Sequence, residues 1–158
     1  MAEEQQPAQQ AAQMGFNIEK IYVKDLSAEV PNAPGVFLER ETPQMDVQLH
    51  TQGSSIGQDM YEVTITATVT GKIADKTLFL VEITQAGIFR IQGVPQEQMP
   101  MVLGIGCPNI VFPYLRETIS DVVIRAGFPP LLLNPVNFEV LFMQQQQQAA
   151  QQPAGATH

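Results

Sequence analysis

The sequence predicts a single α+β domain in which antiparallel strands come first and helices follow on one side of the sheet. Three observations predict this class. Apolar and polar residues alternate strictly over residues 61–70, which are rich in β-branched types and typical of a strand. Leu115, Ile119 and Val122 recur at the spacing of one helix face. A chain of 158 residues has the length of one domain.

The composition indicates an acidic protein whose surface is partly hidden. Charged residues make up 15% of the chain, against about 25% in an average soluble domain, while 44% of residues are apolar. This balance favours an oligomer. The net charge of −8 argues against nucleic acid as a partner and favours a basic one.

The single cysteine, Cys107, excludes an internal disulfide framework and fits a reducing compartment. The first residues lack the basic start and apolar core of a signal peptide, and no apolar run is long enough for a membrane span. We therefore expect a soluble, cytoplasmic protein without direct membrane insertion.

The first ordered segment is expected to be a strand that begins at Phe16. Phe16 and Ile18 differ in parity from Ile21 and Val23, so this strand either contains a bulge or is buried on both faces. Two prolines within residues 30–35 then predict a long crossover loop.

Three further strands follow the crossover loop. Residues 45–50 alternate as a short strand with one apolar face, and residues 61–70 form the clearest strand. Gly71-Lys72 predicts a turn into a returning strand over residues 76–84, which is apolar on both faces. One of its faces is expected to meet the core and the other a subunit interface formed by Phe79, Val81 and Ile83.

The C-terminal half predicts two helices joined by an apolar arm. The first carries Leu115, Ile119 and Val122 as a stripe that another subunit is expected to cover, and it ends at Gly127 before two prolines. After the arm FPPLLL, Asn134-Pro135 predicts the start of a second helix, apolar nearly all round.

The domain is expected to span residues 16–143. Residues 1–15 are rich in Gln, Ala and acid and are expected to be disordered. Residues 144–158 are expected to form a Gln-rich, disordered tail, helical at most near its start.

The residues do not point to an enzyme. Cys107 has no base nearby in any evident pattern, since the only histidines are His50, on a predicted strand, and His158, in the tail. No metal-binding or phosphate-binding motif is present, so we expect no cofactor. Three function classes remain open: a holding chaperone, a small β-rich enzyme or ligand carrier, and a structural oligomer or adaptor.

Several segments together resemble the SecB protein-export chaperones. They are IYVKDLSAEVPNAPGVF, YEVTITATVT, GIFRIQGV, GCPNIVFPYLRE and AGFPPLLLNPVNFEVLF. The resemblance implies a four-stranded antiparallel sheet with two helices, assembled as a dimer of dimers, a homotetramer. It also implies a cytoplasmic chaperone that holds unfolded preproteins in a translocation-competent state and delivers them to the SecA ATPase without catalysing a reaction.

The resemblance also implies site residues. Contact with the zinc-bearing C-terminal tail of SecA falls on Asp25, Glu29, Leu80 and Glu82. Client binding falls on Met45, Val47 and Leu49, with aromatic linings from Phe37, Phe128 and Phe138. The chain departs from the family in having Glu41 where members often have tryptophan, and in its neutral, Gln-rich tail.

Overall fold

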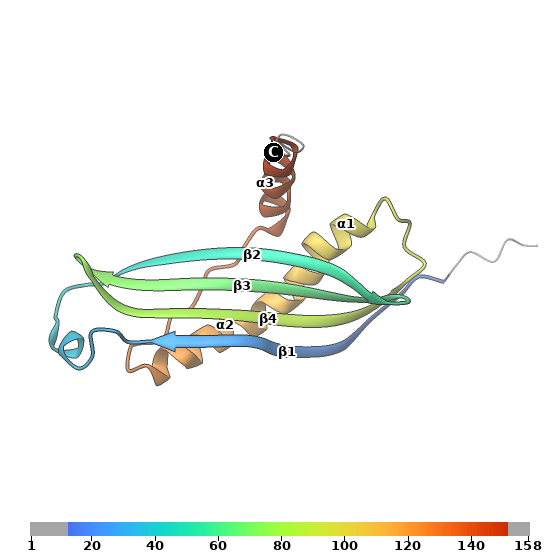
Figure 1. The fold of residues 1–158 in the computed structure, drawn as a ribbon. Helices are drawn as coiled ribbons and strands as arrows, with labels where there is room; N and C mark the ends of the chain where they lie inside the picture. Colours follow the sequence, from blue (N-terminus) through green and yellow to red (C-terminus); the bar gives the residue numbers. More distant parts are fainter. Residues whose placement is uncertain (1–12, 152–158) are drawn as a thin grey trace, which may run out of the picture.

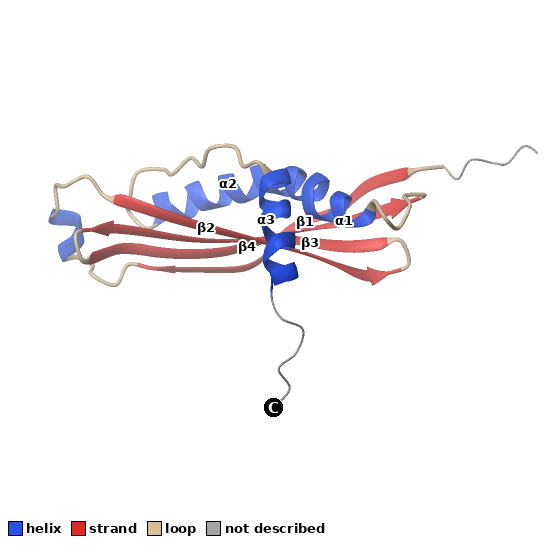
Figure 2. Ribbon diagram, turned by 90° about the horizontal axis from the view of Figure 1, so that it is seen from above, coloured by secondary structure: helices blue, strands red, loops and turns tan. Residues whose placement is uncertain are grey.

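The computed structural model describes residues 13–151 as a four-stranded antiparallel sheet with α2 packed on one face and α3 at the edge formed by β2 (Figures 1 and 2). The α+β prediction is therefore confirmed. The elements, in chain order, are β1 (Gly15–Glu29), a 3-10 turn (Gly35–Leu38), β2 (Gln44–Gly57), β3 (Met60–Ile73), β4 (Lys76–Gln92), α1 (Met99–Met101), a π-helical turn (Val102–Gly106), α2 (Cys107–Arg125) and α3 (Phe138–Gln151).

The strand order is β1-β4-β3-β2, so β1 and β2 lie at opposite edges of the sheet. The chain between them crosses the full width of the sheet, which confirms the crossover loop. The register of β1 against β4 shifts between Ile18 and Lys20 and between Val23 and Asp25. Of the two alternatives for this strand, the bulged one is therefore correct.

The hairpin between β3 and β4 turns at residues 74 and 75, so the prediction of a turn at Gly71-Lys72 was wrong. Gly71 stays inside β3, where a side chain has no room: a Cβ there would lie 2.8 Å from the ring of Phe79. Ala74 takes the left-handed conformation that the turn needs, with a φ of 50°. The glycine therefore marks a close contact within the sheet and not the turn.

The core lies between α2 and the two central strands. Because α2 packs mainly on β3 and β4, the stripe along α2 and the inward rows of these strands bury each other. The assignment of six of these side chains to a subunit interface is corrected, since all six are buried within the single chain: Phe79, Val81, Ile83, Leu115, Ile119 and Val122.

The second long helix begins later and continues further than the sequence predicts. Asn137 caps it, accepting a hydrogen bond of 3.2 Å on Oδ1 from the Val140 amide, whereas Asn134-Pro135 lies in the irregular arm. The helix continues to Gln151, because glutamine is a good helix former and Gln145 reaches Thr51 of β2 at 3.3 Å. The rest of the predicted tail and most of the predicted disordered N-terminus lie outside the described residues.

Neighbouring residues of β4 should differ sharply in their contribution to stability. Phe79→Ala should lower the free energy of unfolding by about 3–5 kcal/mol, because it opens a cavity beneath α2. Leu80→Ala, on the opposite face and 37% exposed, should change it by only about 0.5 kcal/mol. Urea unfolding at a fixed protein concentration measures both. Equal losses would contradict the placement of α2 on the Phe79 face.

Candidate functional site

The face of the sheet that points away from α2 is open and polar. Its central column, on β3, consists of Glu62 followed by threonines at every second position: Thr64, Thr66, Thr68 and Thr70. The hydroxyls of Thr66 and Thr84 hydrogen bond at 2.9 Å, and Thr68 donates to Glu82 at 3.2 Å. These cross-strand bonds give the sheet a hydrogen-bonded, polar surface.

One end of this open face is acidic. Glu29 pairs with Leu80, Leu80 with Thr70, and Thr70 with Asp46, so this row crosses all four strands. Further along the same face lie Glu82, opposite Ser27, and Asp25, opposite Thr84. We call this surface the acidic patch: Asp25, Glu29, Asp46 and Glu82 around Leu80.

The structure thus brings together, at neighbouring register positions, the four residues on which the family resemblance implies SecA binding: Asp25, Glu29, Leu80 and Glu82. Four ion pairs are present within residues 13–151, and none of them involves the carboxylates of Asp25, Glu29 or Glu82. Sequence analysis missed Asp46. Its parity, opposite to that of Met45 and Val47, places it on the polar face, but only the register brings it beside Leu80.

The other half of the open face carries paired charges. Lys24 Nζ lies 2.6 Å from Oε1 of Glu62, and the Tyr22 hydroxyl donates a hydrogen bond to Oε2. The hydrogen bonds from Lys24 and then from Tyr22 hold the pKa of Glu62 below its ordinary value. Burial and the adjacent Glu62 raise the pKa of Tyr22 to about 12. Further along, Arg90 pairs with Glu19 at 3.0 Å.

Sequence analysis missed this cluster. The available signal was Glu62, a charged residue at the head of a column that is otherwise threonine.

The α2 side of edge strand β2 carries an apolar strip. Met45, Val47 and Leu49 point to this side, and Met45 is 40% exposed. At the adjoining end of the molecule, the Phe37 ring stacks on Phe128 with centroids 5.3 Å apart, and Phe128 lies 5.0 Å from Phe79. Phe37 is 49% exposed, whereas Phe128 is half-buried against the core. Two of the three predicted aromatic linings are therefore at least partly accessible.

Phe138, the third predicted aromatic lining, is only 2% exposed, so this expectation is corrected. Its ring meets Phe112 of α2 edge-on at 5.7 Å and anchors the first turn of α3 in the core. Phe138 therefore supports the surface from below and does not line it.

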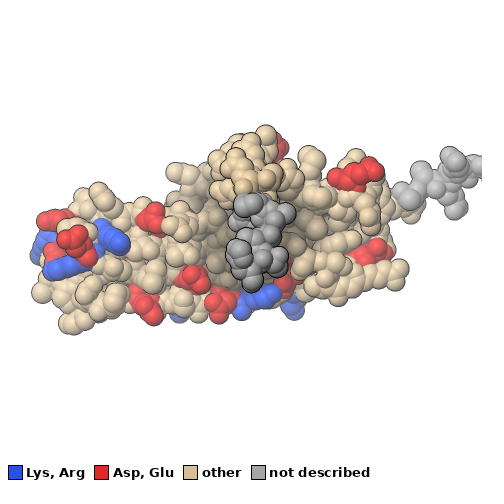
Figure 3. Space-filling view, turned by 45° about the horizontal axis from the view of Figure 1, so that its top comes forward, with Lys and Arg blue, Asp and Glu red and all other residues tan. Residues whose placement is uncertain are grey.

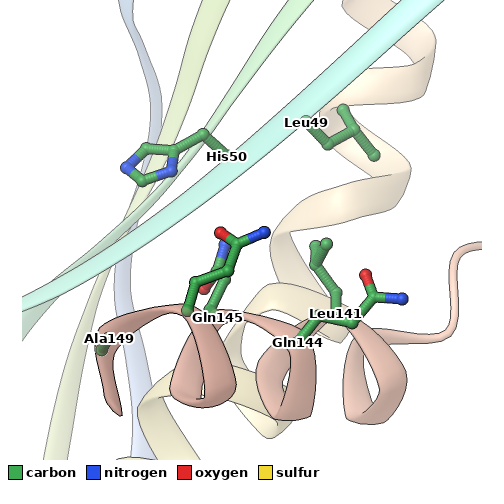
Figure 4. A pocket seen from close by; sticks show the side chains of 7 residues that line it. Leu49, His50, Leu141, Gln144, Gln145 and Ala149 are labelled. Atoms are coloured by element: carbon green, nitrogen blue, oxygen red, sulfur yellow. The ribbon is translucent and has the colours of Figure 1, made fainter. Parts of the chain in front are cut away.

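A cleft of about 460 Å³ lies between β2 and α3 (Figure 4). Leu49 and His50 line it from β2, and Leu141, Gln144, Gln145, Gln148 and Ala149 line it from α3. Its wall is thus partly apolar and partly built of glutamine carboxamides, which both donate and accept hydrogen bonds. Sequence analysis placed these glutamines in a disordered tail and could not assign them to a site.

The α2 side of edge strand β1 is also uncovered. Four large apolar side chains there are between 44% and 49% exposed: Phe16, Ile18, Val23 and Leu26. In Figure 3, charged side chains lie mainly at the two ends of the molecule and along its lower edge, and the area around α3 carries few. Exposed apolar side chains gathered on one strand face are typical of contact sites for other polypeptides.

Cys107 is the single thiol of the chain, and it is buried. Burial raises the pKa of the Cys107 thiol to about 12, so it stays protonated near neutral pH. Residues 13–151 contain no group of three His, Cys, Asp or Glu side chains arranged to hold a metal ion. Within the same residues, no helix is long and apolar enough to cross a membrane.

These surfaces define an α+β protein of the polypeptide-binding class, with a polar open face and apolar strips at both sheet edges. Residues 9–149 match the family model described as preprotein translocase subunit SecB. The chain belongs to the SecB family, and its role is that of a chaperone in protein export.

Two curated relatives carry the name SecB and align with this chain over nearly their whole length. The chain is 71% identical over 156 residues to the protein-export protein SecB of Thiobacillus denitrificans, covering 99% of this chain and 97% of that protein. It is 59% identical over 158 residues to the SecB of Methylobacillus flagellatus, covering both chains fully. Among solved structures, the SecB-like chaperone of Mycobacterium tuberculosis, in complex with a ChAD peptide from the HigA1 antitoxin, shares the fold. Its TM-score is 0.64 at 18% identity, over 77% of this chain and 90% of that one.

Proposed function

We propose that the protein is a non-enzymatic, cytoplasmic holding chaperone that keeps unfolded preproteins translocation-competent and delivers them to SecA. The observation that carries this proposal is the apolar strip of Met45, Val47 and Leu49, which α2 leaves partly uncovered beside the exposed Phe37.

A partner for many unrelated unfolded chains must offer what such chains share, which is exposed apolar side chains and unpaired backbone. The strip presents an apolar group at every second residue of an edge strand. Each fully buried side chain of this size contributes about 1.5–3 kcal/mol. Several weak sites on one oligomer then add through effective concentration, giving tight binding without one specific contact.

The acidic patch suits the proposed contact with the zinc-bearing C-terminal tail of SecA. It offers four carboxylates around one exposed leucine, which complements a basic peptide with an apolar contact. Its position on the open face, away from the apolar strip, leaves client and SecA room to bind together.

We propose that four chains assemble as a dimer of dimers. The apolar row on β1 and the unpaired edge of that strand suit a second copy, which would extend the sheet and cover the row. The outward side of α2 and the arm expose further apolar side chains for a second contact: Tyr114, Ile124 and Leu132. Each interface should bury at least about 1,000 Å².

Replacing Met45, Val47 and Leu49 together by serine should lower the affinity for an unfolded preprotein by about two orders of magnitude or more, since three apolar contacts are lost. Calorimetric titration of the intact oligomer measures this. Gln48→Ser with Gln52→Ser, on the opposite face of the same strand, is the control. Unchanged affinity in the triple variant would refute the site. Unfolding of the triple variant would also refute it, because the residues would then be core.

Replacing Asp25 and Glu29 by lysine should strongly weaken binding of SecA while client binding is retained. The attraction is screened over about 10 Å at 0.1 M salt, so the wild-type affinity should also fall as salt rises. Glu97→Lys with Glu139→Lys makes the same change in net charge away from the open face and should have little effect. Equal affinities for both double variants in a SecA pull-down or titration would disprove this docking surface.

Sedimentation at micromolar concentration should show a mass of four chains. Val23→Lys with Leu26→Lys should shift it to smaller species, because buried lysines cannot be paired in an apolar contact. Ile56→Lys, an exposed apolar position on β2, should leave the mass unchanged. A wild-type protein that sediments as a stable monomer is the result that would exclude the assembly.

A further inference from the structure

We propose that Glu62 is a positioning residue that holds Lys24 across the sheet and so keeps this cation away from the acidic patch. The inference rests on the proposed docking of SecA at that patch. It adds that the negative charge of the patch depends on an ion pair outside it, in the other half of the open face.

The second bulge of β1 places Lys24 next to Asp25, where its positive charge could neutralise part of the acidic patch. Val23 pairs with Gln85 and Asp25 with Thr84, so Lys24 is the extra residue between these pairs. It directly precedes Asp25, and their Cα atoms are therefore about 3.8 Å apart. A free lysine side chain at this position lies within easy reach of the Asp25 carboxylate and would neutralise it.

Instead, Lys24 points away from the patch. Its ammonium group crosses β4 to Glu62 on β3, where the Nζ–Oε1 distance is 2.6 Å. The Glu62 carboxylate is sheltered, with its side chain 16% exposed, whereas the Lys24 side chain is 50% exposed. The less mobile partner is thus the carboxylate, so Glu62 determines where the cation lies.

Tyr22 fixes the carboxylate in turn. Its hydroxyl donates to the second oxygen of Glu62, so both oxygens are occupied by donors and the carboxylate accepts charge-assisted hydrogen bonds. Near neutral pH the Tyr22 hydroxyl is protonated and the Glu62 carboxylate is ionised. The raised pKa of Tyr22 and the lowered pKa of Glu62 extend this state to higher and to lower pH.

The pair of Arg90 and Glu19 is a matched comparison on the same face. Arg90 lies six residues beyond Thr84 on β4, which is about 20 Å along the strand from the level of Asp25. That distance is about twice the screening length of 0.1 M salt. Breaking the Arg90–Glu19 pair should therefore leave the negative charge of the patch unchanged, whereas breaking the Lys24–Glu62 pair should reduce it.

The test titrates a zinc-loaded peptide of the SecA C-terminal tail into full-length protein. Glu62→Gln and Glu19→Gln remove the same charge, and each releases one cation. Glu62→Gln should weaken peptide binding about two- to fivefold, the range of one exposed charge pair, and Glu19→Gln should have no effect. Lys24→Met combined with Glu62→Gln should restore wild-type affinity, because the released cation is gone.

The rescue separates positioning from a structural role, since the double variant still lacks the link between β1 and β3. If Glu62→Gln behaves like Glu19→Gln, or if the double variant stays weak, the inference is overturned. The double reversal of Asp25 and Glu29 to lysine is run in parallel. If that variant binds the peptide normally, docking at the patch fails and the positioning role fails with it. If it binds weakly while Glu62→Gln binds normally, only the positioning role is lost.

Discussion

The structure depends on one mismatch of size: a single helix covers a sheet of four strands. An α-helix with its side chains is about 10–12 Å across, and neighbouring strands are about 4.8 Å apart, so one helix covers about two strands. Here α2 packs mainly on β3 and β4. The inward rows of these central strands are buried completely, while the corresponding rows of β1 and β2 remain partly exposed. The fold thus creates apolar surface at both edges of the sheet.

The two partly exposed edges differ in their surroundings, and this difference favours a different proposed partner for each edge. Among residues 13–151, β1 has extensive contacts with β4 alone, so the row on β1 lies along an open strand edge. Such an edge suits a flat, regular partner such as a second copy of the same strand. The strip on β2 borders the cleft between β2 and α3. The stacked rings of Phe37 and Phe128 lie near its other end. Such an uneven, partly polar surface suits chains of varied sequence better than one fixed partner.

Sequence periodicity predicts which side chains share a face but not what covers that face. The alternation over β4 correctly separated Phe79 from Leu80, yet the covering element proved to be α2 of the same chain and not another subunit. The class of fold and the crossover loop were predictable because each has a local signal. For the first strand the sequence left a bulge and burial on both faces open, and the register with β4 decided for the bulge. The contact of Lys24 with Glu62 was not, since it joins residues 38 positions apart and needs the register of three strands. The glutamines of α3 were misassigned because composition alone does not reveal a helix that docks on β2.

The threonine column keeps the open face polar and so distinguishes it from the apolar α2 side. An apolar open face would stack on the face of another sheet, as in a β-sandwich. Threonine fits a pleated surface as well as valine does, but its hydroxyl keeps the face hydrated and tied by cross-strand bonds. The apolar strip on β2 and the apolar row on β1 therefore lie on the α2 side, and the acidic patch lies on the open face. The sheet separates these surfaces, so the proposed client and SecA contacts do not overlap.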